Sequence, residues 1–368
     1  MPNTKQRILL TGARAPITLE MARSFAKQGH KVIVCDSSRL TIARWSNTIT
    51  KYYTIPAPKN NIKAFIEALQ QIIYQEKIDH LIPTCEETIY IAQEKDKFNC
   101  KVWTCDGDLI LKLHNKLTFS SFNLNGLPTP KTEILNQFTD WMNSKNYVFK
   151  AIYSRFATSV IINQEVNKTT IPEDQQIKWI AQQKINGQEI CIYSIWDEGK
   201  LKGYKAYLPL YKAGKGAGVF FEPVNNQEVY ELVARFGEKI NYTGQLCFDV
   251  IIEENSNIPY FIECNPRGTS GAHLLNNQLA NCYLEKEYTT PFSNQAYKIN
   301  YAMILLHPLV LFNRNVRKAK DVVFKWNDPL PSLLQILSLL EITYKKISQK
   351  CTWLEATTGD IEWNGDEN

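Results

Sequence analysis

Hydrophobic positions near the start of the chain follow first a strand period and then a helical one. A short apolar run at residues 7–10 predicts a buried strand, and residues 17–28 place Leu19, Ala22 and Phe25 on one face of a helix. Gly29 ends that helix, and the apolar run at 31–36 predicts the next strand. A strand–helix–strand unit of this kind builds a parallel sheet.

The same alternation continues to residue 112 and defines the first predicted domain, a Rossmann-like α/β unit over 1–112. Its further elements are a helix at 61–76 and strands at 78–83 and 101–104. A dinucleotide site is the obvious alternative use of such a sheet, but its first turn needs three spaced glycines. The turn at 11–16 contains one, Gly12, so a scaffold role is favoured. Asp36 is then expected to be a loop or helix-cap residue and not a ribose ligand.

From residue 113 the pattern changes to strands joined by turns, with fewer helices. It predicts a helix at 113–124, strands at 147–152, 160–163 and 179–185, a hairpin at 189–196 and 203–211, and a helix at 226–242. This mixture predicts an α+β domain over 113–290, made of a small subdomain (113–182) and a larger one (183–290). Residues 291–368, with a helix at 330–348, form a C-terminal α/β extension to which the sequence assigns no chemistry.

The most informative segment is a pair of short apolar strands around a polar turn centred on Ser256. If they pair as a hairpin, Asp249 lies opposite Glu263, and like charges in that position destabilise a sheet. Asn265 joins the two carboxylates because strand side chains alternate between faces. Carboxylate and amide oxygens are ligands that Mg²⁺ accepts together with substrate phosphates. The bland alternative is a surface hairpin with its polar face in water. The opposite, buried face is expected to hold Phe248, Val250, Ile262 and Cys264.

The run Glu263-x-Asn265-Pro266-Arg267, preceded by a strand bearing Asp249, resembles the metal-binding signature of the ATP-grasp superfamily. The branch of carboxylate–amine ligases and the carbamoyl-phosphate synthetase large subunit is the most similar. Other motifs follow in the family's order: Lys116 with a proline turn at 126–130, Lys150 with the loop at 153–155, and a hinge at 182–189. The resemblance runs from about residue 116 to residue 273, and four motifs in order are specific where one would be weak.

The resemblance implies a fold in which two α+β subdomains hold ATP between them. Lys116 and Lys150 would bind its phosphates, a strand edge at 182–185 would contact adenine, and Glu189 would accept hydrogen bonds from the ribose. Asp249, Glu263 and Asn265 would hold Mg²⁺, or Mn²⁺ in its place. The implied nucleotide-binding residues are Lys116, Lys150, Arg155, Gln182, Gln183, Lys184, Ile185 and Glu189.

The implied reaction is ligation of a small-molecule carboxylate to a small-molecule amine through an acyl phosphate. Arg267 is the expected catalytic residue, because a planar, always-charged guanidinium suits an oxyanion and a leaving phosphate. Its structural alternative is to pair with Glu263 or a neighbouring carboxylate at the hairpin end. Two other functions stay open: phosphorylation of bicarbonate or carbamate, as in carbamoyl-phosphate synthesis, and a non-catalytic ATP-binding regulator. The single grasp unit disfavours the first, and the complete acidic set disfavours the second.

Two features depart from the family pattern, and three residues near the site stay undecided. The loop at 153–159 lacks the usual glycines, and Gln182 stands where an acidic residue is common. Glu86 and Glu87 open a helix, where carboxylates favour the positive end of the dipole, and we leave both outside the core site. For His273 a hydrogen-bonded structural role is favoured over contact with substrate.

Composition narrows the class of protein without adding chemistry. The chain has 368 residues, of which 44% are hydrophobic and 21% charged, as in an ordinary globular protein. The net charge of +5 is spread along the chain, so no nucleic-acid partner is expected. Nine cysteines without C-x-x-C pairs argue against a disulfide framework. With no signal-peptide core and no apolar run long enough for a bilayer, we expect a cytoplasmic protein without a membrane partner, and a homodimer as the assembly to test.

Overall fold

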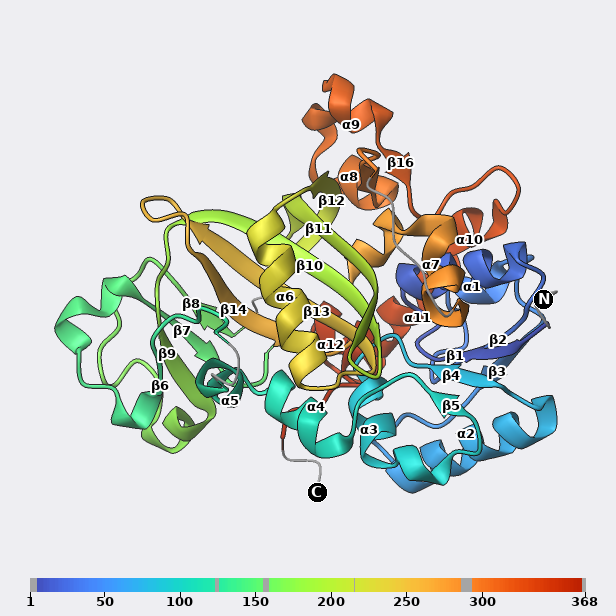
Figure 1. The fold of residues 1–368 in the computed structure, drawn as a ribbon, viewed down its shortest axis with the longest axis horizontal. Helices are drawn as coiled ribbons and strands as arrows, with labels where there is room; N and C mark the ends of the chain where they lie inside the picture. The colour runs from blue at the N-terminus through green and yellow to red at the C-terminus, as the bar shows by residue number, and fades with distance from the viewer. Residues whose placement is uncertain (1–4, 123–125, 155–158, 215, 286–292, 366–368) are drawn as a thin grey trace.

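The computed structural model describes residues 5–122, 126–154, 159–214, 216–285 and 293–365. These residues build three β-sheets that follow one another along the longest axis of the molecule (Figure 1). The five-stranded N-terminal sheet lies at one end, the four-stranded sheet at the other, and the seven-stranded sheet between them.

The N-terminal sheet is parallel, as the strand–helix–strand pattern predicts. Its strand order is β3-β2-β1-β4-β5, so the order reverses at β1 and the turns after β1 and β4 meet at one edge. The side chain of Asn61 caps α2 by accepting a hydrogen bond from the amide of Ala64 at 2.9 Å. The strands are β1 (Arg7–Leu10), β2 (Lys31–Asp36), β3 (Lys51–Thr54), β4 (His80–Ile82) and β5 (Lys101–Val102), and the helices are α1 (Pro16–Lys27), α2 (Ile62–Glu76), α3 (Glu87–Gln93) and α4 (Gly107–His114).

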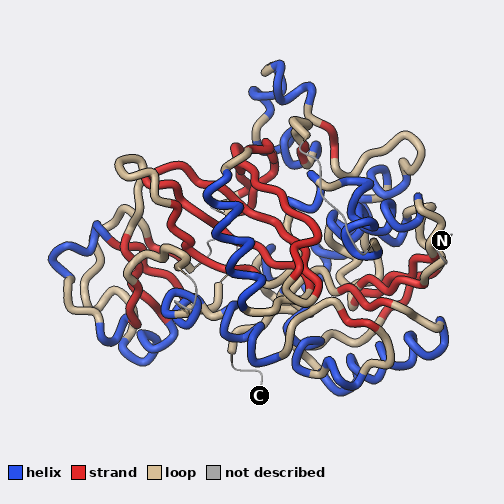
Figure 2. The backbone as a smooth tube through the Cα atoms, viewed as in Figure 1, coloured by secondary structure: helices blue, strands red, loops and turns tan. Residues whose placement is uncertain are grey.

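The other two sheets carry the middle of the chain. The four-stranded sheet is antiparallel in the order β6-β9-β7-β8, and the seven-stranded sheet has the order β14-β13-β10-β11-β12-β15-β16. Helix α6 lies across one face of the larger sheet (Figure 2). The elements are α5 (Lys116–Ser121), β6 (Thr132–Ile134), β7 (Tyr147–Ala151), β8 (Val160–Ile161), β9 (Trp179–Gln183), β10 (Gly187–Asp197), β11 (Lys200–Ala213), β12 (Ala217–Val224), α6 (Gln227–Lys239), β13 (Gly244–Glu253) and β14 (Pro259–Asn265).

The face of β13 and β14 that packs against α6 is aromatic. The ring of Phe248 lies 5.7 Å from that of Phe236 on α6 and 5.4 Å from that of Phe261, both edge to face. Val250 is buried there as predicted, and so is Cys264. The expectation for Ile262 is wrong, because a bulge after Asp249 sets Val250 opposite Phe261 and leaves Ile262 half-buried.

The last part of the chain returns to both of the larger sheets. Strands β15 and β16 extend the seven-stranded sheet, and α12 lies beside α11. The predicted helix at 330–348 is broken at Leu334, whose backbone (φ −93°, ψ 5°) leaves the helical range. The division of the chain at residues 112, 182 and 290 stays a prediction. The elements are α7 (Leu279–Leu284), β15 (Tyr297–Lys298), α8 (Asn300–Leu306), α9 (Arg314–Lys318), β16 (Lys320–Asp321), α10 (Leu330–Leu333), α11 (Gln335–Ser348) and α12 (Trp353–Thr358).

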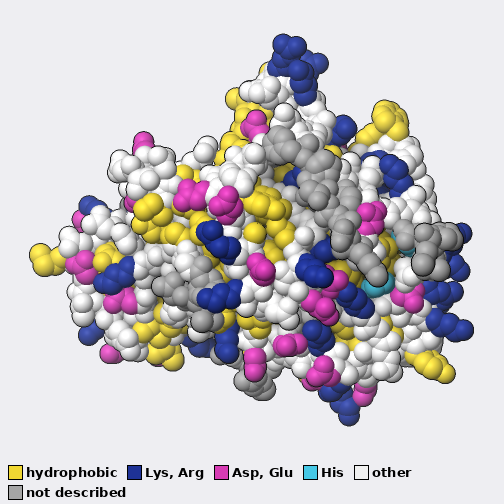
Figure 3. Space-filling view, viewed as in Figure 1, with side chains coloured by type: hydrophobic (Ala, Val, Ile, Leu, Met, Phe, Trp, Pro, Cys, Tyr) yellow, Lys and Arg dark blue, Asp and Glu magenta, His cyan; other side chains and the backbone are white. Residues whose placement is uncertain are grey.

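Short 3₁₀ helices make many of the connections. They are η1 (Ala43–Trp45), η2 (Lys95–Lys97), η3 (Leu135–Gln137), η4 (Trp141–Asn146), η5 (Glu173–Lys178), η6 (Ser270–Leu274), η7 (Asn276–Gln278) and η8 (Pro308–Phe312). On the face drawn in Figure 3, Lys and Arg side chains are interspersed with Asp and Glu side chains, in line with the spread charge of the sequence. Among the described helices, none combines the length and the apolar character needed to cross a membrane.

Candidate active site

Asp249 and Glu263 face each other across β13 and β14, in the predicted register. Asn265 lies on the same face: its Nδ2 atom is 3.4 Å from Oδ2 of Asp249 and 3.3 Å from Oε1 of Glu263. All three side chains are half-buried. The hairpin therefore gathers two carboxylates and an amide at one place that remains open to solvent.

Two lysines from outside the hairpin approach this place. The Nζ atom of Lys116 lies 3.7 Å from Oε2 of Glu263 and donates a hydrogen bond to the carbonyl of Ser154 at 2.9 Å. The Nζ atom of Lys150 donates to the carbonyl of Ile262 at 3.1 Å. Both lysine side chains are buried. Backbone carbonyls thus hold the two ammonium groups beside the acidic pair. No pattern in the sequence predicts this arrangement.

Local structure fixes the backbone positions of Lys116 and Lys150. The side chain of Asn115 accepts hydrogen bonds from the amides of Leu117 and Thr118 at 2.9 and 3.1 Å, which starts α5 at Lys116. Lys150 lies on β7 between β8 and β9, so its backbone is held from both sides. Both lysines therefore come from ordered backbone.

The charges at the site are not shared evenly. Burial raises the pKa of Asp249, and the facing carboxylate of Glu263 raises it further. Burial acts in the same direction on Glu263, but Lys116 and Lys150 outweigh it and lower the pKa of that carboxyl. Burial lowers the pKa of Lys150 to about 8, although Glu263 opposes the shift. The positive charge of the two lysines therefore stabilises the ionised form of Glu263, whereas the ionised form of Asp249 is not stabilised in this way.

A divalent cation fits this donor set. The carboxylate oxygens of Asp249 and Glu263 are hard ligands, and a cation between them would favour the ionised form of both. For Asn265 to contribute its Oδ1 atom the amide must rotate, because Oδ1 accepts a hydrogen bond from Nη2 of Arg267 at 3.2 Å. The described residues contain no group of three or more His, Cys, Asp or Glu side chains that could form an all-protein cage. The set suits Mg²⁺, which keeps water and phosphate ligands.

Arg267 lies between the hairpin end and the N-terminal domain. Its Nε atom is 3.5 Å from Oε1 of Glu86, and its side chain is 20% exposed. Glu86 is buried, and its Oε2 atom lies 3.4 Å from the amide nitrogen of Trp363. The predicted site does not include Glu86. The only sequence feature that pointed to this residue is the acidic turn before α3. The structure brings it next to Arg267, with the end of the chain behind it.

Gln182 belongs to the same region as the lysines. It is buried on β9, and its Nε2 atom donates to Oγ1 of Thr132 at 3.0 Å and towards the carbonyl of Ile262 at 3.4 Å. Lys150 donates to that same carbonyl. Ile262, the extra residue of the bulge, thus joins the smaller sheet to the acidic hairpin.

The prediction that residues 182–185 offer a free strand edge is wrong for the backbone amides of Gln183 and Lys184. Strand β9 lies inside its sheet, paired with β6 on one side and β7 on the other. The amides of Gln183 and Lys184 donate to backbone carbonyls at 2.8 Å, so they are already used. Ile185 is buried. An adenine contact by the remaining groups of this hinge stays a prediction.

Glu189 lies on β10, where its carboxylate pairs with Lys212 of β11. A Cβ atom at Gly187 would lie 1.9 Å from the carbonyl oxygen of Ile252, so the glycine permits the close approach of β10 and β13. Nearby, Lys212 pairs with Gly218 where β11 and β12 meet. Of the predicted phosphate-contacting residues, Arg155 lies outside the described residues.

Three further residues near the site have contacts that explain them structurally. His273 is buried on η6, with its Nδ1 atom 3.3 Å from Oε2 of Glu20. Glu87 is buried and accepts a hydrogen bond from Oγ1 of Thr11 at 2.5 Å. Asp36 is the last residue of β2, so the prediction of a loop or helix-cap residue is wrong; its carboxylate pairs with Arg14 and accepts a hydrogen bond from the amide of Ser38 at 2.9 Å.

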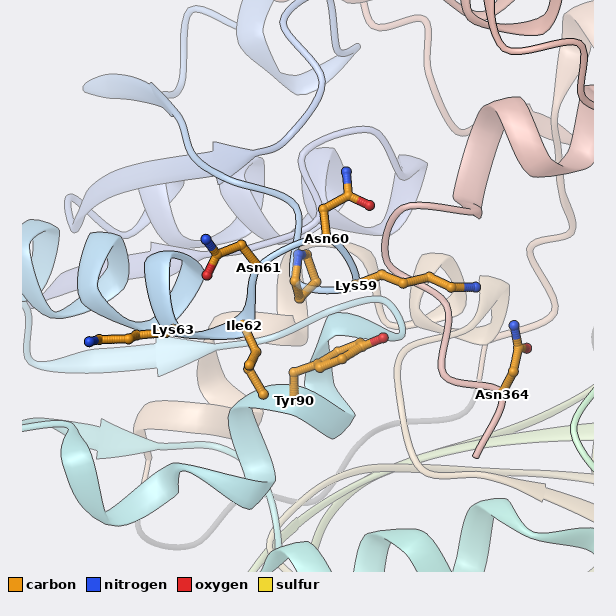
Figure 4. Close-up of a pocket in the computed structure, with 8 residues that line it drawn as sticks. Lys59, Asn60, Asn61, Ile62, Lys63, Tyr90 and Asn364 are labelled. Atoms are coloured by element: carbon orange, nitrogen blue, oxygen red, sulfur yellow. The ribbon is translucent and has the colours of Figure 1, made fainter. Parts of the chain in front are cut away.

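A hollow lies elsewhere on the molecule, between the start of α2 and the segment at Asn364 (Figure 4). Its volume is about 560 Å³, and Lys59, Asn61, Tyr90 and Asn364 are among its lining residues. None of the predicted site residues lines it. The acidic hairpin is therefore the place where the described residues concentrate chemistry.

Comparisons with known proteins agree with this geometry. Residues 113–271 match the family model described as the ATP-grasp domain. No curated protein matches the chain.

Solved structures show the same fold at low sequence identity. N5-carboxyaminoimidazole synthetase from Staphylococcus aureus is 15% identical, with a TM-score of 0.58 over 81% of this chain and 82% of that chain. L-amino acid ligase from Bacillus licheniformis is 15% identical, with a TM-score of 0.56 over 77% and 74% of the two chains. The biotin carboxylase domain of the Hydrogenobacter thermophilus 2-oxoglutarate carboxylase, solved with MgADP, ADP and bicarbonate, is 14% identical, with a TM-score of 0.59 over 78% and 72%.

Proposed function

We propose that the protein is an ATP- and Mg²⁺-dependent ligase that joins a carboxylate to an amine, because residues 113–271 match the ATP-grasp domain model. One observation carries the proposal: the facing pair Asp249 and Glu263, with Asn265 beside it, lies within reach of two buried lysines from other elements. The solved structures of similar fold include an amino-acid ligase and complexes with ADP or MgADP.

The residues divide the work by charge. Asp249, Glu263 and Asn265 would hold Mg²⁺, which would supply positive charge to neutralise the phosphates of ATP. Lys116 and Lys150 bind phosphate oxygens as point charges. Their present partners are carbonyls and one carboxylate, so phosphate oxygens exchange with these contacts. Phosphoryl transfer asks for such positioning and charge neutralisation more than for covalent chemistry by the protein.

The reaction proceeds in two balanced steps. A substrate carboxylate oxygen attacks the γ-phosphorus, the bond to the β-phosphate oxygen breaks, and an acyl phosphate and ADP form. The amine nitrogen then attacks the acyl carbon, inorganic phosphate leaves with the bonding pair, and a proton is lost from nitrogen. Arg267 stabilises the oxyanion and the leaving phosphate in the second step.

Phosphate release tests the function directly. We would assay release from ATP over a panel of amino acids and other small carboxylates, each with and without amine acceptors, and with bicarbonate as a separate arm. The proposal expects release that depends on both a carboxylate and an amine. Release with bicarbonate alone would favour the carbamoyl-phosphate-like alternative. ATP binding without any stimulated release would make the protein a nucleotide-binding regulator.

Arg267→Lys separates a catalytic arginine from a structural one. Lysine keeps the charge but loses the planar fork, so kcat and kcat/KM should fall together by about tenfold or more while ATP affinity changes little. Steady-state kinetics beside thermal melts decides the matter. If the variant melts earlier yet its folded fraction turns over normally, Arg267 serves the contact with Glu86 and the catalytic role is wrong.

A further inference from the structure

Helix α11 turns its apolar side chains outward. Its bounds are Gln335–Ser348, and none of its residues is fully buried. Ile336, Leu340, Tyr344 and Ile347 recur at intervals of three or four residues, so they share one side of the helix. Their exposed fractions run from 58% to 71%. Together with two neighbours they form what we name the outer face of α11: Leu333, Ile336, Leu339, Leu340, Tyr344 and Ile347.

The side of α11 that meets the rest of the molecule is polar instead. The carboxylate of Glu341 accepts hydrogen bonds from the amides of Arg39 and Leu40 at 3.0 and 2.6 Å. The Nζ atom of Lys345 donates to Oγ of Ser38 at 2.7 Å. A surface helix ordinarily places its apolar stripe against the core and its charges in water. In α11 the most exposed apolar side chains and the polar contacts to the rest of the chain lie on different sides.

The size of the outer face suits a protein interface. If each large apolar side chain offers about 150–200 Å² when fully exposed, the six together leave on the order of 600 Å² in solvent. That area is at the upper limit of roughly 300–600 Å² for the largest apolar patch of a typical monomer. With a polar rim it approaches the ~800 Å² that each partner contributes to a standard stable interface.

The distribution of charge indicates how two copies would pair. The outer face itself carries no charged side chain, whereas Lys346 and Lys350 lie at its C-terminal end. Parallel pairing of two copies would bring these lysines side by side and cost energy. Antiparallel pairing about a two-fold axis places them at opposite ends of the seam. A seam along α11, Gln335–Ser348, is about 21 Å long, and Leu340 lies near its middle.

We propose that the outer face of α11 is the interface of a symmetric homodimer, in which the α11 helices of two copies of this chain pack antiparallel across Leu340. Apolar side chains at three- and four-residue spacing interdigitate in helix pairs of this kind. The proposal stands apart from the ligase activity, because no residue of the acidic hairpin takes part in it.

Sedimentation of the full chain over a range of concentrations tests the assembly. The wild-type protein should sediment with twice the mass of one chain, and Leu340→Glu should weaken dimerisation by about a hundredfold, since two buried carboxylates would face each other at the axis. Tyr74→Glu on α2 is the matched control, because Tyr74 is 85% exposed and lies outside the outer face. A monomeric wild type, or a Leu340→Glu variant that stays dimeric, would overturn the proposal.

Two checks keep this result interpretable. Leu340 is 58% exposed in one chain, so its replacement should leave the circular-dichroism spectrum and the binding of a non-hydrolysable ATP analogue unchanged. Disulfide trapping then tests the direction of pairing. In the antiparallel dimer Leu340→Cys should cross-link two chains above the background of the native cysteines, whereas Ile347→Cys should not. Efficient trapping through Ile347→Cys would contradict the two-fold arrangement.

A membrane surface is the competing occupant of a lysine-flanked apolar helix. Vesicles of neutral lipid and vesicles with anionic lipid distinguish the two. The proposal expects no flotation of the protein with either kind. Flotation with anionic vesicles that Leu340→Glu abolishes would assign the outer face to lipid and overturn the dimer.

Discussion

Two acidic clusters in this chain stand in opposite electrostatic situations. At the edge of the N-terminal sheet, Asp36 and Asp360 share the guanidinium of Arg14, with N–O distances of 2.6 Å to each. At the acidic hairpin, Asp249 and Glu263 face each other, and the positive charge of the nearby lysines lowers the pKa of Glu263 but not that of Asp249. The charges of the first cluster are balanced within the chain, and under the proposed function a cation from outside would balance those of the second.

The pKa values record the same contrast. Burial raises the pKa of Asp360, but hydrogen bonds and charge pairing with Arg14 lower it to about 2. For Asp249, burial and the facing carboxylate both raise the pKa. At a pH above the unfolded pKa, a carboxyl group whose folded pKa is lowered stabilises the fold, whereas one whose folded pKa is raised costs stability. The acidic cluster whose charges are balanced within the chain thus has a structural role, and the cluster whose charges are not balanced is the proposed binding site.

The largest expected effect is the loss of activity in Glu263→Gln. The change removes a metal ligand and the shared partner of Lys116 and Lys150, which costs several kcal/mol of transition-state stabilisation, so turnover should fall more than about tenfold. Glu254→Gln, in the exposed turn of the same hairpin, is the matched control and should keep full activity. Mg²⁺-dependent turnover above roughly a tenth of the original rate in Glu263→Gln would show that the metal assignment is wrong.

Arg14→Met should instead damage the fold. It leaves the side chain of Asp36, which is 1% exposed, without its cation, and breaking such a buried pair costs about 3–5 kcal/mol. Urea unfolding measures the loss, with the exposed Arg39→Met as control. Turnover per folded molecule should stay unchanged. An Arg14→Met protein of normal stability and reduced activity would move the Arg14 cluster into the active site and erase the contrast.

A smaller effect is expected in the pH dependence of nucleotide binding. Because the pKa of Lys150 is lowered to about 8, its positive charge is present below that pH and lost as the pH rises through it. Affinity for a non-hydrolysable ATP analogue should therefore fall above about pH 8, by less than about tenfold per unit. Lys150→Arg should flatten this fall, and Lys150→Ala and Lys116→Ala should weaken binding at every pH. Calorimetry would contradict the phosphate role if both alanine variants bound as tightly as Lys31→Ala.

Much of the fold, and the arrangement of the acidic residues on the hairpin, could be predicted from the local sequence pattern. Alternation of apolar and polar residues placed Asp249 opposite Glu263 with Asn265 beside them, and the register is confirmed. The bulge that replaced Ile262 by Phe261 in the core has no local signature, because it depends on how β14 meets the neighbouring sheet. The break at Leu334 was missed for a similar reason, since the apolar pattern continues through it.

Contacts between distant segments could not be predicted at all. The carbonyls of Ser154 and Ile262 that hold the two lysines carry no side-chain code. Glu86 meets Arg267 because the turn after β4 faces the hairpin end, a matter of how the domains pack. Asp360 reaches Arg14 from the far end of the chain. Each of these contacts depends on how distant segments pack together, so the identity of the residues alone does not predict it.

The most direct test of the contrast between the clusters is a pair of thermal melts at pH 7 without nucleotide and with a chelator present. Asp249→Asn removes a carboxylate whose ionisation costs stability, so this variant should melt a few degrees above the wild type while losing Mg²⁺-dependent nucleotide binding. Asp360→Asn removes a carboxylate that Arg14 stabilises and should melt a few degrees below it. If Asp249→Asn melts below the wild type as Asp360→Asn does, the hairpin pair is a structural element and the proposed cation site is contradicted.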